Sequence, residues 1–540
     1  MAVAEPRSPP GEDTLARHSV AVAKWTLVSR VVGFVRVLVV AAVLGPTYLG
    51  NTFGATNMIP NLVFELLAGS LIASLLVPLL VRHADAQDTL RAERVAGGFL
   101  GLAVAAFAAV LVAGALAGPL LLALLTTTVS DPAVAEAQRD AGLLLLALFA
   151  PQILFYAVAA VGGAVANADG RFALAAAAPA LESVGVIATF GAFALVHGTG
   201  GSVTAVTDAE LLLLGLGTTA SVGLHAGAQW WGARRAGVRL RPRWGWRDPE
   251  VRELVRRTVP SLVYAALNTT RWIAATVVAN AVAGGVVAFY LAVNIFFLPI
   301  AVGARPVATA ALPALSRLHD DLGRFRDELV RAIALVGFVV VPAALACTVL
   351  ARPLADALSF GEQAGGDGVV LLAACLAGLG IGMIGEAVFL VATNGAYAQG
   401  RVDLPVRGMA VRTVVSVAGM GAALAVDGGW QSLLALALAM TAGDVAAAWY
   451  LARGVLRDLP QGGRRLRPAA ARAVGGAVLM ILPAAGVAAG VDALVDGAPD
   501  APVAMIAAAV AGTATFVALQ RAWGSPELAF FAAGLGRRRG

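Results

Sequence analysis

The sequence predicts an all-α polytopic membrane protein of fourteen transmembrane helices, built as two pseudo-symmetric six-helix lobes followed by two C-terminal helices. Of its 540 residues, 59% are hydrophobic and only 13% are charged. The mean hydropathy of +0.82 is far too high for a soluble protein. Apolar runs of about 20 residues, the length that crosses a bilayer, recur along the whole chain. An internal repeat, described below, predicts the two lobes.

The fourteen apolar runs are bounded by charged residues, proline or glycine. They are centred near residues 35, 67, 110, 155, 186, 214, 275, 300, 339, 380, 415, 436, 478 and 510. Arginine concentrates in every second loop, at 82–94, 171, 234–257, 317–331, 401–412 and 453–472. Because cytoplasmic loops carry the Lys/Arg excess, this alternation predicts that both termini are cytoplasmic.

These patterns divide the chain into six segments. We expect a cytoplasmic tail over 1–19, an N-lobe over 20–233, a basic cytoplasmic linker over 234–257, a C-lobe over 258–457, two further helices over 458–522 and a cytoplasmic tail over 523–540. The first segment lacks the apolar core of a cleavable signal, so targeting is expected to reside in the first membrane helix. The net charge of +6 follows from the arginine-rich loops, so we expect membrane lipid and no nucleic acid as a partner.

Two pairs of short segments define the repeat. LVPLLVRHAD, residues 76–85, resembles ALPALSRLHD, residues 311–320, and NADGRF, residues 167–172, resembles YAQGRV, residues 397–402. The offsets, 235 and 230, are nearly constant, and both pairs end a helix that runs toward the cytoplasm in this topology. The lobes are therefore predicted to be parallel copies.

Charged residues inside the apolar runs are the candidate functional groups, because a charge in a membrane helix is costly and usually faces the protein interior or water. The opening helix of the N-lobe carries Arg30 and Arg36, and the repeat offset places Arg271 in the opening helix of the C-lobe. Guanidinium groups bind phosphate through paired hydrogen bonds, so these three arginines predict a site for a phosphate-bearing anion.

The remaining charged residues in the runs leave more than one interpretation open. For Glu65 and Glu182, an internal ion pair and a functional role are equally compatible with the sequence. For Arg305, Glu386 and Asp444, we expect positions near helix ends from which the side chains extend toward water. None of the five histidines is expected near the middle of a membrane helix.

Asparagine and proline mark corresponding helices in the two lobes. The second helix carries Asn57 and Pro60, and the eighth carries Asn294 and Pro299. Proline removes a backbone hydrogen bond and loosens or kinks a helix, so Pro60 and Pro299 are predicted to act in gating. The two asparagines are candidate polar groups of the same site.

Four segments resemble a known family. SRVVGFVR at 29–36, followed by IPNLVFELLAGSLIASLLVPLL at 59–80, resembles the opening of the MurJ/MviN lipid II flippases of the multidrug/oligosaccharidyl-lipid/polysaccharide exporter superfamily. LPALSRL at 312–318 and AQGRVDLP at 398–405 resemble later motifs of that family. The resemblance implies a transporter in the bacterial cytoplasmic membrane, with no catalytic residue and no cofactor. It also implies a cationic central cavity in which Ser29, Arg30 and Arg36 match family cavity residues.

The chain departs from the family pattern at three places. Val37 stands where an aspartate is common, Val63, Phe64 and Glu65 stand where an arginine is expected, and Val293 and Asn294 replace an Asp-Arg pair. Arg271 is a candidate replacement for the lost positive charge. With Asn57, Asn294 and Glu65, it completes the predicted substrate-binding set; no metal site is predicted.

The function expected from these observations is export of an undecaprenyl-pyrophosphate-linked peptidoglycan precursor, lipid II, by alternating access of the two lobes. Coupling to the membrane potential or to a monovalent cation is the expected energy source, since the chain has no P-loop pattern. Two alternatives use the same fold: a cation-coupled exporter of drugs or polysaccharide-lipid intermediates, and an inactive membrane scaffold. A membrane-embedded glycosyltransferase fits less well, because the predicted outer loops lack clustered carboxylates.

Overall fold

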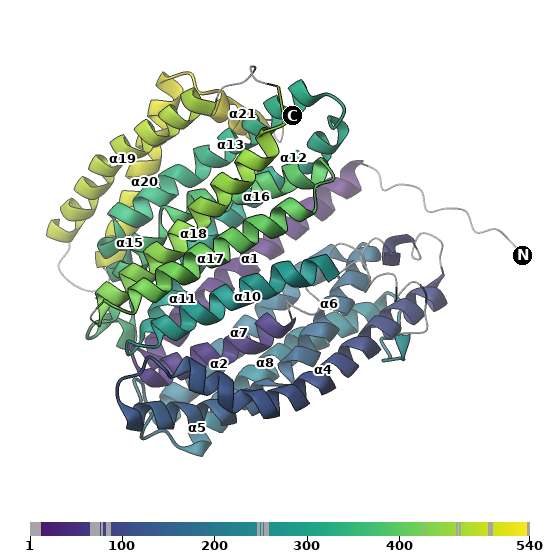
Figure 1. Ribbon diagram of the computed structural model, residues 1–540, viewed down its shortest axis with the longest axis vertical. Coiled ribbons are helices and arrows are strands. Elements are labelled where there is room, and N and C mark those ends of the chain that lie inside the picture. The colour runs from purple at the N-terminus through teal and green to yellow at the C-terminus, as the bar shows by residue number, and fades with distance from the viewer. Residues whose placement is uncertain are drawn as a thin grey trace, which may run out of the picture. The chain divides into compact units, whose positions relative to one another are not determined.

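The computed structural model describes residues 12–64, 76, 79–82, 88–245, 249, 252, 259–426, 428–460, 463, 466–494 and 500–536. Over these residues the secondary structure is helical, without strands (Figure 1). The chain divides into two compact units, Met1–Thr269 and Thr270–Gly540. The all-α prediction is therefore confirmed, and the finer division into six segments stays a prediction.

Unit 1 holds seven long helices and the first half of an eighth. They are α1 (Glu12–Leu44), α2 (Tyr48–Phe64), α4 (Thr89–Leu125), α5 (Pro132–Phe149), α6 (Gln152–Ala168), α7 (Phe172–His197), α8 (Asp208–Arg235) and the start of α10 (Val259–Ala279). Helix α7 packs on α1 and α8, and α6 also packs on α8. These contacts bring α1, α7, α8 and α6 together around one set of polar side chains.

The ends of the unit 1 helices follow from local residue chemistry. Gly45 takes a positive φ of 63° where α1 ends, which a residue without a Cβ adopts readily. Asp131 accepts from the backbone N–H of Ala133 and precedes Pro132 at the first position of α5. Thr207 and Glu210 form a reciprocal capping box at the start of α8. These caps set the frame in which α7 and α8 meet.

Unit 2 contains the rest of α10 and the helices that follow it. They are α11 (Gly285–Pro299), a π-helical turn (Ile300–Ala304), α12 (Arg305–Arg317), α13 (Leu322–Val349), α14 (Ala351–Leu358), a 3-10 turn (Gly361–Ala364), α15 (Gly368–Leu379), α16 (Gly382–Ala398), α17 (Asp403–Ala423), α18 (Trp430–Leu456), α19 (Leu466–Leu494), α20 (Asp500–Ala522) and α21 (Pro526–Gly536). Helix α18 packs on α15, α16 and α17, while α19 and α20 pair with each other and α19 packs on α13.

Ten described helices are long and apolar enough to cross a membrane, and the bent pair 368–379 and 382–398 gives an eleventh. The predicted number of fourteen is not reached among the described residues. One predicted span, centred near residue 67, lies mostly outside them. The multi-pass architecture itself is clear from the helices that are described.

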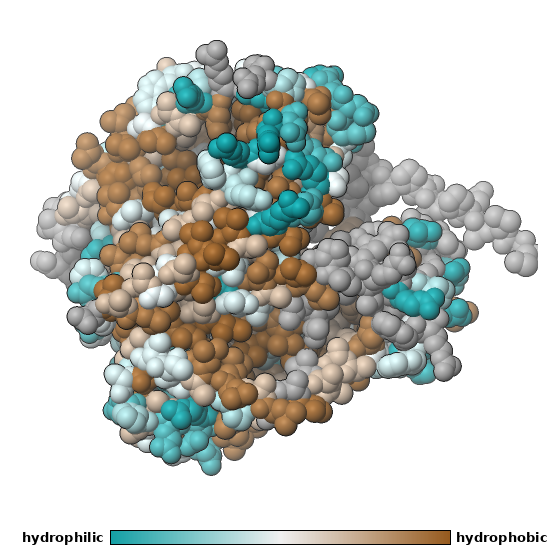
Figure 2. Space-filling view, viewed as in Figure 1, coloured by the Kyte–Doolittle hydropathy of each residue, from teal (hydrophilic) through white to brown (hydrophobic). Residues whose placement is uncertain are grey.

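The surface of these helices is apolar where a soluble protein would be polar. Leu116, Leu195, Leu482 and Ile506 are each at least 66% exposed. Figure 2 shows hydrophobic side chains over the visible sides of the helices and hydrophilic ones gathered near helix ends. Such exposure suits contact with lipid, because acyl chains do not penalise it.

The first part of the predicted linker is packed instead of solvated. The backbone N–H of Arg239 donates to Glu93 Oε1 at 2.8 Å, and that of Arg243 donates to the Gly97 carbonyl at 2.9 Å. Val238 and Leu240 are buried in the same cluster as the start of α4. This segment therefore stabilises unit 1, and most of residues 246–258 lie outside the described part of the chain.

Candidate functional site

A partly buried polar cluster lies inside unit 1, among α1, α7 and α8. Arg36 Nη1 of α1 donates to Glu182 Oε1 of α7 at 3.1 Å. The other carboxylate oxygen, Glu182 Oε2, lies 3.0 Å from His225 Nδ1 of α8. The side chain of Arg36 is 33% exposed, whereas those of Glu182 and His225 are 13% and 14% exposed. One carboxylate is thus shared by two basic groups, and the arginine is the more accessible of them.

Helix α6 adds Tyr156 beside this cluster. The hydroxyl of Tyr156 lies in the electrostatic field of both Glu182 and Arg36. The Asn61 amide of α2 lies 3.5 Å from the same hydroxyl. The cluster therefore draws polar groups from five helices of unit 1.

Small residues let α7 and α8 approach closely enough for this contact. A Cβ on Gly185 of α7 would lie 2.5 Å from Ser221 Oγ of α8, and one on Gly217 would lie 2.4 Å from a methyl of Thr189. Glu182 and His225 lie about one helical turn from the contact between Gly185 and Ser221, on the same two helices. The sequence brings the carboxylate and the imidazole together through close helix packing.

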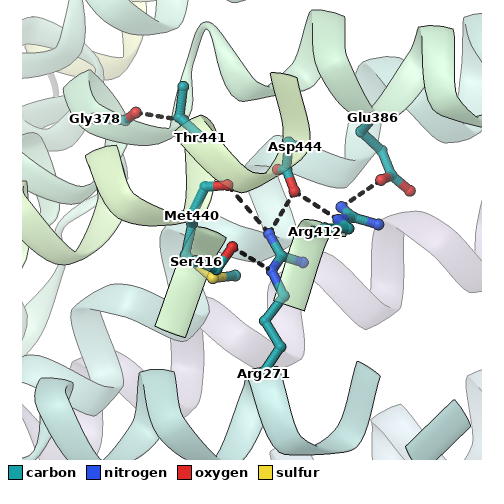
Figure 3. Close-up of polar contacts among 8 residues, drawn as sticks. All are labelled: Arg271, Gly378, Glu386, Arg412, Ser416, Met440, Thr441 and Asp444. Carbon is teal, nitrogen blue, oxygen red and sulfur yellow. Dashed lines mark hydrogen bonds and ion pairs between the residues drawn. The ribbon is translucent and has the colours of Figure 1, made fainter. Parts of the chain in front are cut away.

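A second polar cluster lies inside unit 2, and three of its four charged side chains are buried. Arg271 of α10 donates to Asp444 of α18 at 2.5 Å, to Ser416 Oγ at 3.1 Å and to the Met440 carbonyl at 3.4 Å. Arg412 of α17 bridges Asp444 at 2.7 Å and Glu386 of α16 at 2.5 Å (Figure 3). The side chains of Arg271 and Asp444 are each 2% exposed. Two arginines and two carboxylates balance each other in this cluster.

Glycines also position the unit 2 cluster. A Cβ on Gly443 of α18 would lie 2.0 Å from Ser416 Oγ and 2.6 Å from the Arg412 carbonyl. A Cβ on Gly385 of α16 would lie 2.7 Å from the backbone of Asp444. Helix α18 therefore meets α16 and α17 backbone to backbone, which places Asp444 between the charged groups of both.

The two clusters occupy equivalent positions in the internal repeat. The turns at Gly170 and Gly400 have φ values of 78° and 72°, and both following arginines bind the last turn of a helix. Arg171 donates to the Arg235 carbonyl at 3.0 Å, and Arg401 donates to the Gly454 carbonyl at 2.9 Å. These contacts align α7 with α17 at an offset of 230 and α8 with α18 at an offset of 219.

Stacked Trp–Arg pairs support the second offset. Trp230 stacks under Arg234 in α8, and Trp449 lies under Arg453 in α18. Four positions of one cluster then match four of the other. Arg36 matches Arg271 at the offset of 235, Tyr156 matches Glu386 and Glu182 matches Arg412 at 230, and His225 matches Asp444 at 219.

The predicted site residues of unit 1 lie on α1 and α2. Ser29 is half-buried and Arg30 is exposed on α1, while Asn57 is half-buried on α2. Pro60 is buried, and α2 continues as an α-helix past it to Phe64. Of this predicted set, the structure joins Arg36 to the cluster, and Glu65 lies outside the described residues.

The predicted residues of unit 2 around the eighth span are local to their own helix. The Asn294 amide donates to the Tyr290 carbonyl one turn earlier, at 2.8 Å. Pro299 ends α11 and is followed by the π-helical turn Ile300–Ala304. Proline removes a backbone donor, which fits an irregular turn at this point.

The structure bears on four further expectations. Arg271, predicted to bind an anion, is 2% exposed and pairs with Asp444, and its role in anion binding stays a prediction. Asp444 and Glu386 do not extend toward water near helix ends; both pair with Arg412 inside unit 2. Arg305, at the start of α12, is exposed, which agrees with the expected extension toward water.

The functional residue that sequence reasoning missed is His225. It lies near the middle of α8 and contacts Glu182, although no histidine was expected in such a position. Glu182 itself forms the internal ion pair that the sequence left open. Repeat alignment of α8 with α18 would have paired His225 with Asp444 and drawn attention to it.

Comparison with known proteins agrees with this geometry. A family model described as "Lipid II flippase MurJ" matches residues 40–499. The chain belongs to the MurJ family. A probable lipid II flippase MurJ from Haemophilus influenzae is 27% identical over 47% of this chain and 49% of its own length. One from Rhizobium tropici is 25% identical over 82% of this chain and 84% of its own length.

The MurJ relatives differ in how much of them this chain matches. A probable lipid II flippase MurJ from Vibrio cholerae is 27% identical over 46% of each chain. The chain thus spans about half the length of the Haemophilus and Vibrio relatives in these matches, and most of the length of the Rhizobium relative.

Solved structures share the fold. A structure titled "Lipid II flippase MurJ, inward closed conformation" covers 93% of this chain and 99% of its own with a TM-score of 0.72 at 14% identity. An inward-facing MATE family multidrug transporter covers 79% of this chain and 94% of its own with a TM-score of 0.64 at 15% identity. Both likenesses show the fold alone, which is that of a multi-pass membrane transporter.

Proposed function

We propose that this chain is a flippase that moves lipid II, an undecaprenyl-pyrophosphate-linked peptidoglycan precursor, from the cytoplasmic to the outer leaflet of the bacterial cytoplasmic membrane. Membership of the MurJ family over residues 40–499 is the observation that carries the proposal. The relatives in that family are named lipid II flippases. Both termini are proposed to be cytoplasmic, following the loop arginines.

Arg36 is the proposed contact for the diphosphate. It lies within the apolar span 24–44, where a charge is retained only for a reason, and its side chain is 33% exposed. A guanidinium with free N–H donors binds phosphate oxygens in pairs. Its repeat equivalent, Arg271, is buried against Asp444, so we place at Arg36 the contact that the sequence had divided among Arg30, Arg36 and Arg271.

The energy source fits an anionic cargo. An anion that leaves an inside-negative cell gains about 2.3 kcal/mol per charge for each 100 mV of membrane potential. Alternating access of the two units then requires no ATP. We propose coupling to the membrane potential, and the cluster at Glu182 offers a place where a cation can also act.

A cation-coupled exporter of drugs or polysaccharide-lipid intermediates is the second candidate. It is favoured by the MATE-like fold and by a membrane carboxylate, Glu182, that holds two basic groups. An inactive scaffold of the same fold predicts that neither Arg36 nor Glu182 matters for transport. The test below separates all three.

The test is a leaflet-specific assay of lipid II in cells that depend on this chain. After depletion, outward lipid II should fall, wild-type protein should restore it, and Arg36→Ala should not. The control is Arg352→Ala, which removes an exposed arginine that pairs with Asp356 within one helix. Normal outward lipid II in the Arg36→Ala strain, at matched protein level, would sink the assignment. Loss of drug or polysaccharide export with normal lipid II would favour the second candidate.

A further inference from the structure

The sharing of Glu182 has a chemical consequence for the histidine ring. A carboxylate accepts hydrogen bonds and donates none. His225 Nδ1, 3.0 Å from Glu182 Oε2, must therefore carry a hydrogen. The ring is either the neutral Nδ1–H tautomer or the imidazolium, and the two differ by one proton on Nε2.

That proton changes the net charge of the cluster. With a neutral ring, Arg36 and Glu182 cancel and the cluster carries no net charge. With an imidazolium, the two positive groups share one carboxylate and the net charge is +1. Because Glu182 then faces a second cation, it binds Arg36 less exclusively, and the guanidinium is freer to take an anion.

We propose that His225 is a proton-binding site that controls anion binding at Arg36. The proton enters at His225 Nε2, Glu182 turns toward the imidazolium, and Arg36 receives the diphosphate of the cargo. Deprotonation returns Glu182 to Arg36 and expels the anion. This inference rests on the proposed function, since it describes how the same diphosphate contact is regulated.

Among the charged groups around this cluster, histidine is the residue type that changes charge between pH 5 and 8. Helix α7 presents Glu182, and α6 presents Tyr156, the one titratable residue of that helix. Helix α1, packed on α7, presents Arg36 and Arg30. Helix α5 contacts α8 through Leu148, near the C-terminal end of α5. The charged residues of α5 lie toward its other end. Arginine stays protonated and tyrosine stays neutral between pH 5 and 8, where histidine changes charge.

The unit 2 cluster supports the inference by contrast. In the repeat, Asp444 occupies the position of His225, and Arg412 occupies the position of Glu182. No histidine is among its charged members, which are two arginines and two carboxylates in contact. The device that responds to pH belongs to unit 1.

The experiment measures binding of farnesyl diphosphate, a water-soluble isoprenyl diphosphate, to the purified full-length protein between pH 5.5 and 8. The wild type should bind at least about fivefold more tightly at pH 5.5 than at pH 8, since one positive charge is added beside the anion. His225→Gln keeps a hydrogen-bond donor but cannot titrate, so its binding should not tighten at pH 5.5. His197→Gln is the matched control: it removes a histidine of α7 that lies 3.8 Å from Glu210. It should behave like the wild type, and protonation of the probe affects every variant alike.

Two further measurements make the outcome decisive. Glu182→Gln should bind the probe at pH 8 about as tightly as the wild type binds it at pH 5.5. In protein with nitrogen-15 histidine, the ring signal missing from His225→Gln should titrate, and its midpoint should move to higher pH when the probe is bound, because linkage is reciprocal.

The results also separate the two proposals. Binding that still tightens at pH 5.5 in His225→Gln, or a His225 signal that the probe does not move, overturns the proton site and leaves the flippase assignment standing. Absence of diphosphate binding at every pH, together with normal outward lipid II after depletion, overturns both.

Discussion

The two polar clusters occupy the same positions of two repeated units but differ in charge and burial. In unit 1, one carboxylate serves an arginine that is 33% exposed and a histidine. In unit 2, two arginines and two carboxylates neutralise each other, and the central pair is 2% exposed. Repeat-equivalent helices thus carry a partly exposed cluster with a histidine in one unit and a charge-balanced, buried ion network in the other.

The difference teaches what a buried charge does in each place. A balanced, buried network adds no accessible charge, and removing one member leaves an uncompensated ion that is costly. A partly exposed group with a titratable neighbour can exchange partners at lower cost. We therefore assign transport chemistry to unit 1 and structural support to the unit 2 cluster.

The largest effect on stability should come from Asp444. Asp444→Ala leaves Arg271 and Arg412 without their shared carboxylate, and loss of one partner from a buried pair costs about 3–5 kcal/mol. We expect a large fall in the melting temperature of the detergent-purified protein. Glu182→Ala should lower it much less, because its partner Arg36 is partly exposed. Equal falls in melting temperature for the two variants would contradict the difference in burial and charge balance between the clusters.

Helix packing behind the unit 2 cluster should show the next largest effect. In Gly443→Ala, the new methyl would overlap Ser416 Oγ and the Arg412 carbonyl, and overpacking of this kind costs about 1–3 kcal/mol. Gly421→Ala on α17 is the control, since nothing lies within 4 Å of its Cβ position. A melting temperature for Gly443→Ala equal to that of the control would show that α17 and α18 are not held this closely.

The smallest effect concerns the ion pair between Glu527 of α21, which lies outside the candidate spans, and Arg472 of α19. Burial alone raises the pKa of Glu527, but hydrogen bonds from Arg472 and Ser525 outweigh it and hold that pKa below its ordinary value. The contribution of ionised Glu527 to folded-state stability is therefore complete above the ordinary glutamate pKa of about 4.3. It is lost as the pH falls from there through the lowered pKa of the folded state. Glu527→Gln should flatten the acid side of a melting-temperature profile. If the melting temperature of Glu527→Gln falls at low pH as it does in the wild type, Glu527 does not contribute to acid stability.

Much of the fold could be predicted from the sequence, because long apolar runs identify membrane helices. The parallel repeat was visible in Gly170 and Gly400, whose backbone conformations are nearly the same. That repeat also related Arg36 to Arg271, and each of them pairs with a carboxylate in its own unit. The count of fourteen spans stays a prediction, since helices such as α17 carry internal charges that depend on tertiary partners.

The candidate site was predictable only in part. Arg36 stood out because an arginine in an apolar run needs a reason. The partner of each charge depends on which helix faces touch, and this was not readable from residues as far apart as Arg271 and Asp444. His225 was missed because its importance comes from contact with Glu182 on the neighbouring helix.

The most direct test compares the two repeat-equivalent arginines by the same substitution. Farnesyl diphosphate binding is measured at pH 6 for folded, full-length Arg36→Gln and Arg271→Gln. A charge-assisted hydrogen bond contributes about 1.5–3 kcal/mol, so Arg36→Gln should weaken binding about tenfold or more, whereas Arg271→Gln should leave it within about twofold of the wild type. Equal losses for the two variants, or a larger loss for Arg271→Gln, would contradict the assignment of the anion contact to unit 1.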